Sequence, residues 1–408
     1  MSSAAPVAGT DRPAALPPRL RTVAVLLVGL LVTVQRDWGR LVRPTLRSED
    51  GYIFLKQARE DGLQAILELY RGYLHLLPRL VALVWRDVPL TWQPGLYAWS
   101  AVLIGFGLAA MALSPRLSWL LPHRWQRELL FASLIIAPAR DEVSGNIANL
   151  IFVGALGLLF VALKRDTPNR PVALAETLLV AVLAMSGPGA VFLLPAFAVR
   201  AWRMRSVQSY LLVGVVVVAT AIQWGTLVFN PRTSDNSGSV TVWFGFVGRR
   251  AFTSAWFGAD RLTGLWHGWW PLLIPATLLL VFALAVVVRH STQRLVLGAL
   301  WLGFAMATLV PSLAYYFMAD SDRAQRHLLL PITIITLVFI TGLTDRLRPV
   351  RVFAMVGLAV MLLAIGRDYV LSSLPFKPIG PAATCLAGGR PPCPVQSNTS
   401  QWDFTLSH

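Results

Sequence analysis

Repeated apolar runs with very few charges constrain the fold of this chain more than any other feature. The longest runs each approach the roughly 20 apolar residues that an α-helix needs to cross a bilayer. They cover residues 23–34, 101–113, 211–228, 272–288 and 350–365. Charged residues make up 14% of the chain, whereas a soluble domain carries about 25%. The sequence therefore predicts an all-α, polytopic transmembrane helix bundle.

Short basic segments between the apolar runs predict the orientation of the chain. Lys and Arg collect in the cytoplasmic loops of membrane proteins. An inside N-terminus places the basic loops at 164–170, 200–205 and 346–351 in the cytoplasm and most acidic residues outside. This arrangement predicts eleven spans, near residues 22–35, 95–113, 127–138, 147–163, 172–186, 188–202, 206–229, 268–289, 295–316, 328–343 and 350–366.

The same pattern divides the chain into three parts. Residues 1–20 are rich in Ala and Pro and predict a disordered cytoplasmic tail. Residues 21–366 form the predicted transmembrane domain, and residues 367–408 form a polar tail outside. The net charge of +16 is typical of loop anchors that contact anionic lipids. No basic block is interleaved with aromatic residues, so we exclude nucleic acid as a partner.

A long outer loop, residues 36–94, follows the first span. Within it, apolar residues recur at helical spacing between residues 53 and 70, which predicts amphipathic helices lying along the membrane surface. The later stretch 73–88 is short and is interrupted by Pro78 and Arg79. We interpret it as a further helix on the outer face, with a twelfth span as the alternative.

The two cysteines of the chain, Cys385 and Cys393, both lie in the polar tail. The glycines and prolines between them suit the turn of a small disulfide loop. A pair confined to one tail favours a disulfide in an oxidising compartment, and two free thiols are the alternative.

Candidate functional residues lie on the predicted outer side. Glu49 and Asp50 are adjacent carboxylates just after the first span, and charged groups this close to a bilayer mark functional sites more often than elsewhere. Further polar residues of the predicted outer segments are His75 and Arg79 in the same loop, Glu142, Asn146 and Asn149 in the next turn, and Arg323, Arg326 and His327 before the tenth span.

A carboxylate facing several cations suits the transfer of a sugar from a lipid phosphate to an acceptor hydroxyl. Asp50 or Glu49 would act as the base that takes the hydroxyl proton. Arginine binds phosphate oxygens through two parallel hydrogen bonds, and histidine can hydrogen-bond the same group. Lipid head-group anchoring is the alternative role for Arg323 and Arg326. The phosphate-binding candidates are Arg326, His327, Arg323, His75 and Arg79, and the substrate-binding candidates are Glu142, Asn146 and Asn149.

The order of these features resembles the GT-C superfamily of polyprenyl-phosphate-dependent membrane glycosyltransferases. Members share a first span, an outer loop that opens on an acidic motif and holds amphipathic helices, and many further spans. Glu49 and Asp50 match the acidic motif. The segment Arg326-His327-Leu328-Leu329-Leu330-Pro331 resembles an arginine before Leu-Pro in a late outer loop. The resemblance implies that the acidic residue is the catalytic base or, in metal-dependent members, a metal ligand.

These observations lead us to expect a glycosyltransferase in a bacterial inner membrane, with its active site on the outer face. Its expected partners are a polyprenyl-phosphate sugar donor, a glycan or lipid acceptor and membrane lipids. We expect no required cofactor, with Mg²⁺ or Mn²⁺ as the alternative, because the acidic pair supplies few of the oxygens of an octahedral site. The alternatives are a transporter or flippase for a lipid-linked substrate, for which Glu176 offers a charge within a span, and a non-catalytic membrane protein of envelope assembly.

Overall fold

The computed structural model describes residues 17–407, apart from 138–141, 231–237, 253–269, 291–292, 316–317, 319–321, 368, 370–375, 390 and 399. The structure is 76% helical and 2% strand, which confirms the all-α prediction. Most of residues 1–20, the predicted N-terminal tail, lie outside the described residues.

The elements follow one another with short connections. The first half of the chain contains α1 (Pro18–Val42), η1 (Asp50–Leu55), α2 (Lys56–Glu60), η2 (Gly62–Leu67), α3 (Leu76–Val84), η3 (Leu90–Trp92), α4 (Gln93–Ala110), η4 (Met111–Leu113), η5 (Pro115–Leu117), α5 (Arg124–Ile135), α6 (Leu150–Leu163), α7 (Arg170–Ala184), η7 (Pro188–Leu193) and α8 (Leu194–Met204). The second half contains α9 (Val207–Phe229), α10 (Val240–Gly245), η8 (Phe246–Phe252), α12 (Trp270–Arg289), α13 (Arg294–Ala314), η10 (Asp322–Leu328), α14 (Leu329–Gly342), α15 (Arg348–Arg367), α16 (Gly380–Ala387), β1 (Cys393–Val395), η11 (Ser400–Trp402) and β2 (Phe404–Leu406).

Four helical segments in the described part of the chain are long and apolar enough to cross a membrane. They are Leu90–Leu113, Val207–Phe229, Arg294–Ala314 and Gln325–Gly342. These segments support a membrane protein. They do not reproduce the eleven spans predicted from the sequence, and they fall short of the many spans that the GT-C resemblance implies.

Helix length explains most of this difference. The predicted spans near 127–138, 147–163, 172–186 and 188–202 correspond to α5, α6, α7 and α8, which have 12, 14, 15 and 11 residues. At about 1.5 Å per residue, a helix of 14 residues is only about 21 Å long, whereas the hydrocarbon core is about 30 Å thick. Hydropathy alone does not distinguish such a short buried helix from a span.

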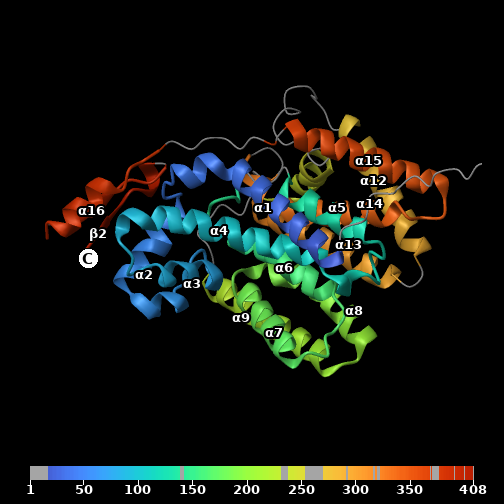
Figure 1. The fold of residues 1–408 in the computed structure, drawn as a ribbon, viewed down its shortest axis with the longest axis horizontal. Coiled ribbons are helices and arrows are strands. Elements are labelled where there is room, and N and C mark those ends of the chain that lie inside the picture. Colours follow the sequence, from blue (N-terminus) through green and yellow to red (C-terminus); the bar gives the residue numbers. More distant parts are fainter. Residues whose placement is uncertain are drawn as a thin grey trace, which may run out of the picture.

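The described helices differ strongly in how far they are buried. All residues of α14 are buried, because helices cover it on several sides. In α9 only 22% of the most apolar window is buried, and large side chains such as Val218, Val228 and Phe229 are exposed. An exposed apolar surface of this extent on a long helix is typical of contact with lipid. The bundle therefore has a central protein-facing helix and peripheral helices with apolar outer faces (Figure 1).

The first loop, residues 43–89, consists of short helices. η1 is a π-helix, and it continues directly into α2. α3 has nine residues, too few for a span, so segment 73–88 does not form a twelfth one. The predicted amphipathic face is only partly formed, because Ala58 is buried whereas Leu63 is 73% exposed.

The C-terminal segment returns to the first loop. In Figure 1, α16 and β2 lie at the same end of the molecule as α2 and α3, far from α15. β1 and β2 pair antiparallel, with Cys393 opposite Leu406. The backbone N–H of Ser407 donates to Glu60 Oε1 at 3.0 Å, which joins this segment to α2.

Candidate functional site

Asp50 begins η1 and is almost completely buried. Its side chain is 2% exposed. Oδ1 accepts a hydrogen bond from the backbone N–H of Ala148 at 2.9 Å, and Oδ2 accepts one from Ile147 at 3.3 Å. No Lys or Arg side chain of the described residues pairs with this carboxylate. Asp50 is therefore a buried acid that is held by two amides.

This environment changes the proton affinity of Asp50. Burial raises the pKa of its carboxyl to about 7, and the negative charge of Glu49 adds to the rise. The amides of Ala148 and Ile147 and the positive charge of Arg47 oppose it. A carboxyl with a pKa near 7 is present in both protonation states at neutral pH, which suits a group that accepts and releases a proton.

Glu49 is more accessible and has different partners. The hydroxyl of Tyr70 donates to Glu49 Oε1 at 3.2 Å, and Arg71 Nε donates to the oxygen of Tyr70 at 3.2 Å. Burial and the charge of Glu49 raise the pKa of Tyr70 to about 12, so this hydroxyl keeps its proton at neutral pH. The two adjacent acids thus occupy different environments, and Asp50 is the one whose pKa suits a base.

The turn that carries Ile147 and Ala148 is held by the polar residues that the sequence assigned to substrate. The side-chain oxygen of Asn146 accepts from the backbone N–H of Asn149 at 3.2 Å, and Asn149 Nδ2 donates to the carbonyl of Glu142 at 2.9 Å. Asn146 and Asn149 are 4% and 6% exposed. In the described contacts these two amides shape the turn that binds Asp50.

Arg326 meets the same turn from η10. Its Nη1 lies 3.1 Å from Glu142 Oε1, and its backbone N–H donates to Oε2 at 3.1 Å. Burial raises the pKa of Glu142, and the charge of Arg326 opposes that rise. The guanidinium lies 5.7 Å from the ring centre of Phe152, and the ring of His327 packs edge-on against Phe152 at 4.9 Å. The Nε atom of Arg326 is buried and has no hydrogen-bond partner within the described structure.

The structure brings some of the predicted site residues together and separates others. The turn 142–149 joins Asp50 to Glu142 and Arg326. Arg323 lies in η10, but its side chain is outside the described residues.

His75 and Arg79 contact the later part of η1 and α2. His75 is 2% exposed and stacks on Tyr73 at 4.4 Å. Arg79 is 1% exposed, donates to Gln57 Oε1 at 2.8 Å and lies over the ring of Phe54. Burial lowers the pKa of Arg79 to about 10. A phosphate role for these two side chains stays a prediction, and their burial disfavours direct contact with a large lipid donor.

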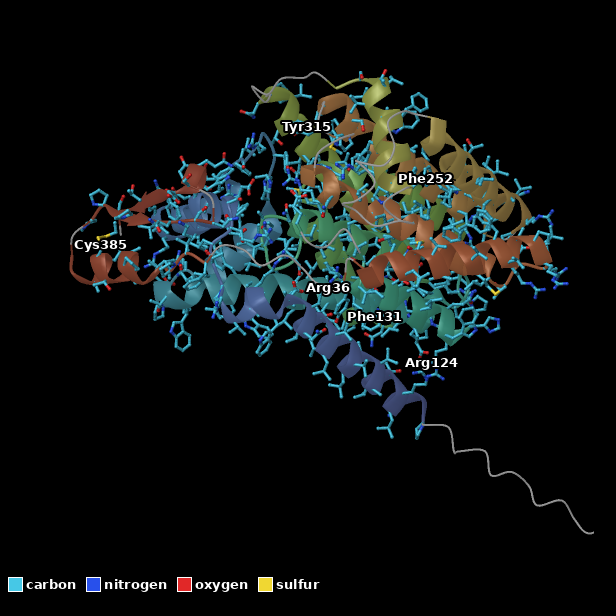
Figure 2. All side chains as sticks on the ribbon, turned by 90° about the horizontal axis from the view of Figure 1, so that it is seen from above. Arg36, Arg124, Phe131, Phe252, Tyr315 and Cys385 are labelled. Carbon is cyan, nitrogen blue, oxygen red and sulfur yellow. A yellow bond between two sulfur atoms is a disulfide. The ribbon has the colours of Figure 1, made fainter. Side chains whose placement is uncertain are left out.

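Sequence reasoning did not single out the polar residues at the end of α1. Arg40 Nη1 and Arg47 Nη1 both donate to the carbonyl of Ser144, at 3.2 and 2.7 Å, and the hydroxyl of Ser144 donates to Asp37. Arg36 donates to the carbonyls that end α5, from a position part-way along α1 (Figure 2). Arg36 and Arg40 are four residues apart on one helix face, a spacing that could have identified them.

The cysteines are joined as the sequence favoured. Cys385 and Cys393 form a disulfide with a Cα–Cα distance of 5.7 Å. Figure 2 shows Cys385 at one end of the molecule. Among the described residues, no group of three or more His, Cys, Asp or Glu side chains is arranged to hold a metal ion. Whether the protein uses Mg²⁺ or Mn²⁺ stays a matter of prediction.

Comparison of the chain with protein-family models and with curated proteins finds no match in either case. The functional argument therefore rests on the site itself.

Proposed function

We propose that this chain is a multi-pass membrane glycosyltransferase that moves a sugar from a polyprenyl-phosphate donor to an acceptor hydroxyl. The proposed location is a bacterial inner membrane, with the reaction on its outer face. The observation that carries the proposal is the buried carboxyl of Asp50, whose pKa is raised to about 7 and which no cation neutralises. We assign the base to Asp50 and a supporting role to Glu49.

In the proposed reaction, Asp50 takes the proton of the acceptor hydroxyl while that oxygen forms a bond to the anomeric carbon of the sugar. The bond from the anomeric carbon to the phosphate oxygen breaks, and its electron pair leaves with the polyprenyl phosphate. Asp50 then releases its proton to water. A positioned base of this kind contributes about 10²–10⁴-fold to a rate.

Arg326 is the candidate for the departing phosphate. Glu142 binds Nη1 and the backbone N–H, which fixes the orientation of the side chain. The opposite edge of the guanidinium carries Nε, which has no partner within the described structure. That edge offers two parallel N–H groups, the geometry with which arginine binds phosphate oxygens. His327, on the other side of Phe152, is the supporting candidate.

The test is a membrane assay with polyprenyl-phosphate hexoses and pentoses that carry a radiolabel in the sugar. Wild type, Asp50→Asn and Glu49→Gln are compared with and without EDTA. We expect wild-type membranes to form labelled product and Asp50→Asn to form almost none. Movement of the intact donor across the membrane without product would favour the transporter alternative. Full product formation by Asp50→Asn would reject the proposed base.

A further inference from the structure

The C-terminal module, defined here as the described part of residues 376–407, is a small unit built on the first loop. The disulfide joins α16 to β1, and β1 pairs with β2. Two buried residues, Val395 and Leu406, fill the space between these strands and the loop (1% and 0% exposed). The module therefore has its own covalent and hydrogen-bonded frame.

One residue of the module binds the backbone on both sides of Arg47. The backbone N–H of Asn398 donates to the carbonyl of Leu46 at 3.0 Å. Its side-chain Oδ1 accepts from the backbone N–H of Ser48 at 2.9 Å. Ser48 has a φ of +34°, in the left-handed region that non-glycine residues seldom adopt. These two bonds hold the backbone immediately before the acidic pair in an uncommon conformation.

A second contact lies on the other side of Asp50. A Cβ atom at Gly51 would lie 2.7 Å from the ring of Phe404, so only glycine lets this ring approach the backbone so closely. Phe404 is 6% exposed and packs edge-on against Tyr52, with 6.3 Å between ring centres. The module thus contacts the chain before and after Asp50.

We infer that the C-terminal module holds the acidic motif in its reactive conformation, with Asn398 as the positioning residue. This inference rests on the proposed function. The link to Asp50 is short, because the backbone N–H of Asp50 donates to the carbonyl of Arg47 at 2.7 Å, within the segment that Asn398 holds. A shift of that segment would move the Asp50 carboxylate away from the amides of Ile147 and Ala148. Small misplacements of a catalytic group cost large factors in rate.

The test compares full-length Asn398→Ala with Asn398→Asp and with Gln396→Ala. Asn398→Ala removes the acceptor for the Ser48 amide, Asn398→Asp keeps an oxygen at that position, and Gln396 is an exposed neighbour. We expect Asn398→Ala to lower kcat about tenfold with little change in KM for the donor, because an unpaired buried amide costs about 1–3 kcal/mol. Asn398→Asp should retain most of the rate, and Gln396→Ala all of it.

Hydrogen exchange of peptides spanning residues 46–52 provides a readout independent of catalysis. Exchange there should be faster in Asn398→Ala than in wild type and unchanged in Gln396→Ala. A thiol assay verifies that each variant keeps its disulfide. If Asn398→Ala fails this check, Phe404→Leu replaces it, because it removes the ring beside Gly51 and keeps an apolar residue in β2.

The outcomes separate the two proposals. Unchanged exchange in both Asn398→Ala and Phe404→Leu would overturn the positioning role. Faster exchange together with a fully active Asp50→Asn would reject the proposed base while supporting the contact of the module with the motif. Equal kcat in Asn398→Ala and wild type, despite faster exchange, would also overturn the positioning role.

Discussion

Two buried aspartates of this molecule, Asp50 and Asp166, have opposite surroundings. Asp166 lies between α6 and α7, where Arg200 Nη2 approaches its Oδ1 at 2.5 Å and the hydroxyl of Ser209 donates at 2.9 Å. Ser206 donates to it as well. Asp50 has two backbone amides and no cation.

The difference appears in the proton affinity of the two groups. Burial raises the pKa of Asp166, but the hydrogen bonds from Ser206 and Arg200 and the charge of Arg200 outweigh it, so its pKa is below the usual value. The pKa of Asp50 is raised to about 7. Glu176, close to Asp166, is also paired, with Arg116 at 2.6 Å and Lys164 at 3.7 Å. A fully paired carboxylate stabilises the fold, whereas an unpaired one is available for proton transfer.

The largest expected effect breaks this comparison by exchanging each aspartate for asparagine. Asp50→Asn should lower kcat by about 10²–10⁴-fold with the protein still folded, because the base is lost. Asp166→Asn should leave kcat of the folded protein unchanged. It should instead destabilise the protein by about 3–5 kcal/mol, because Arg200 remains buried without its partner. Rates and thermal midpoints of the purified variants measure both. Similar rate losses in the two variants would contradict the assignment.

A smaller effect is expected at the arginine that faces the donor. Arg326→Lys keeps the charge and loses the two parallel N–H groups, so it should raise the donor KM about 10–100-fold, the equivalent of about 1.5–3 kcal/mol. Arg326→Ala should raise it further. Rates measured over a range of donor concentration test this, with Arg203→Lys as a control at the other end of the bundle. Superimposable curves for wild type and Arg326→Lys would exclude Arg326 as a phosphate ligand.

The pH dependence should distinguish a base with a raised pKa from an ordinary aspartate. Asp50 must be ionised to act, so kcat/KM should fall about tenfold per unit as the pH drops below about 7 and level off above it. The folded protein holds this proton between about pH 4 and pH 7 whereas the unfolded chain does not. The contribution of Asp50 to stability therefore falls as the pH rises through that window. A rate that is constant down to pH 5 would argue against Asp50.

The smallest expected effect concerns the hydrogen bond that orients Glu49. Tyr70→Phe removes the hydroxyl that donates to Glu49 and keeps the ring that packs on Phe54. A net hydrogen bond contributes about 0.5–1.5 kcal/mol, so we expect a loss of roughly two- to tenfold in kcat/KM. The acid limb of the pH profile should stay near pH 7, because Asp50 is untouched. A loss as large as that of Asp50→Asn would transfer the main role to Glu49.

The sequence was sufficient for the helical class and for the location of the acidic pair. Glu49 and Asp50 stood out because adjacent charges beside an apolar run are rare. The burial of His75 and Arg79 was not predictable in the same way, because a short helix such as α3 gives too few turns to define its inner face. The span number failed for a related reason: α6 is as apolar as a span and is instead buried against neighbouring helices.

Long-range contacts account for the rest of what the sequence did not reveal. Asn398 and Ser48 are 350 residues apart, and Arg47 and Ser144 are 97 apart. No local pattern of spacing connects such positions, since each bond depends on the path of the whole bundle. The tail could be predicted to carry a disulfide, but not to contact the acidic motif.

The hydrogen bond between Asn398 and Ser48 has a consequence for biosynthesis. The codon for Asn398 is read 350 positions after that for Ser48, so ribosomes working at about 5–20 residues per second need roughly 20–70 s to supply the second partner. During that interval the acidic motif has already been released from the ribosome without the segment that completes its surroundings. A nascent chain would thus be inactive until its distal end is delivered to the same side of the membrane.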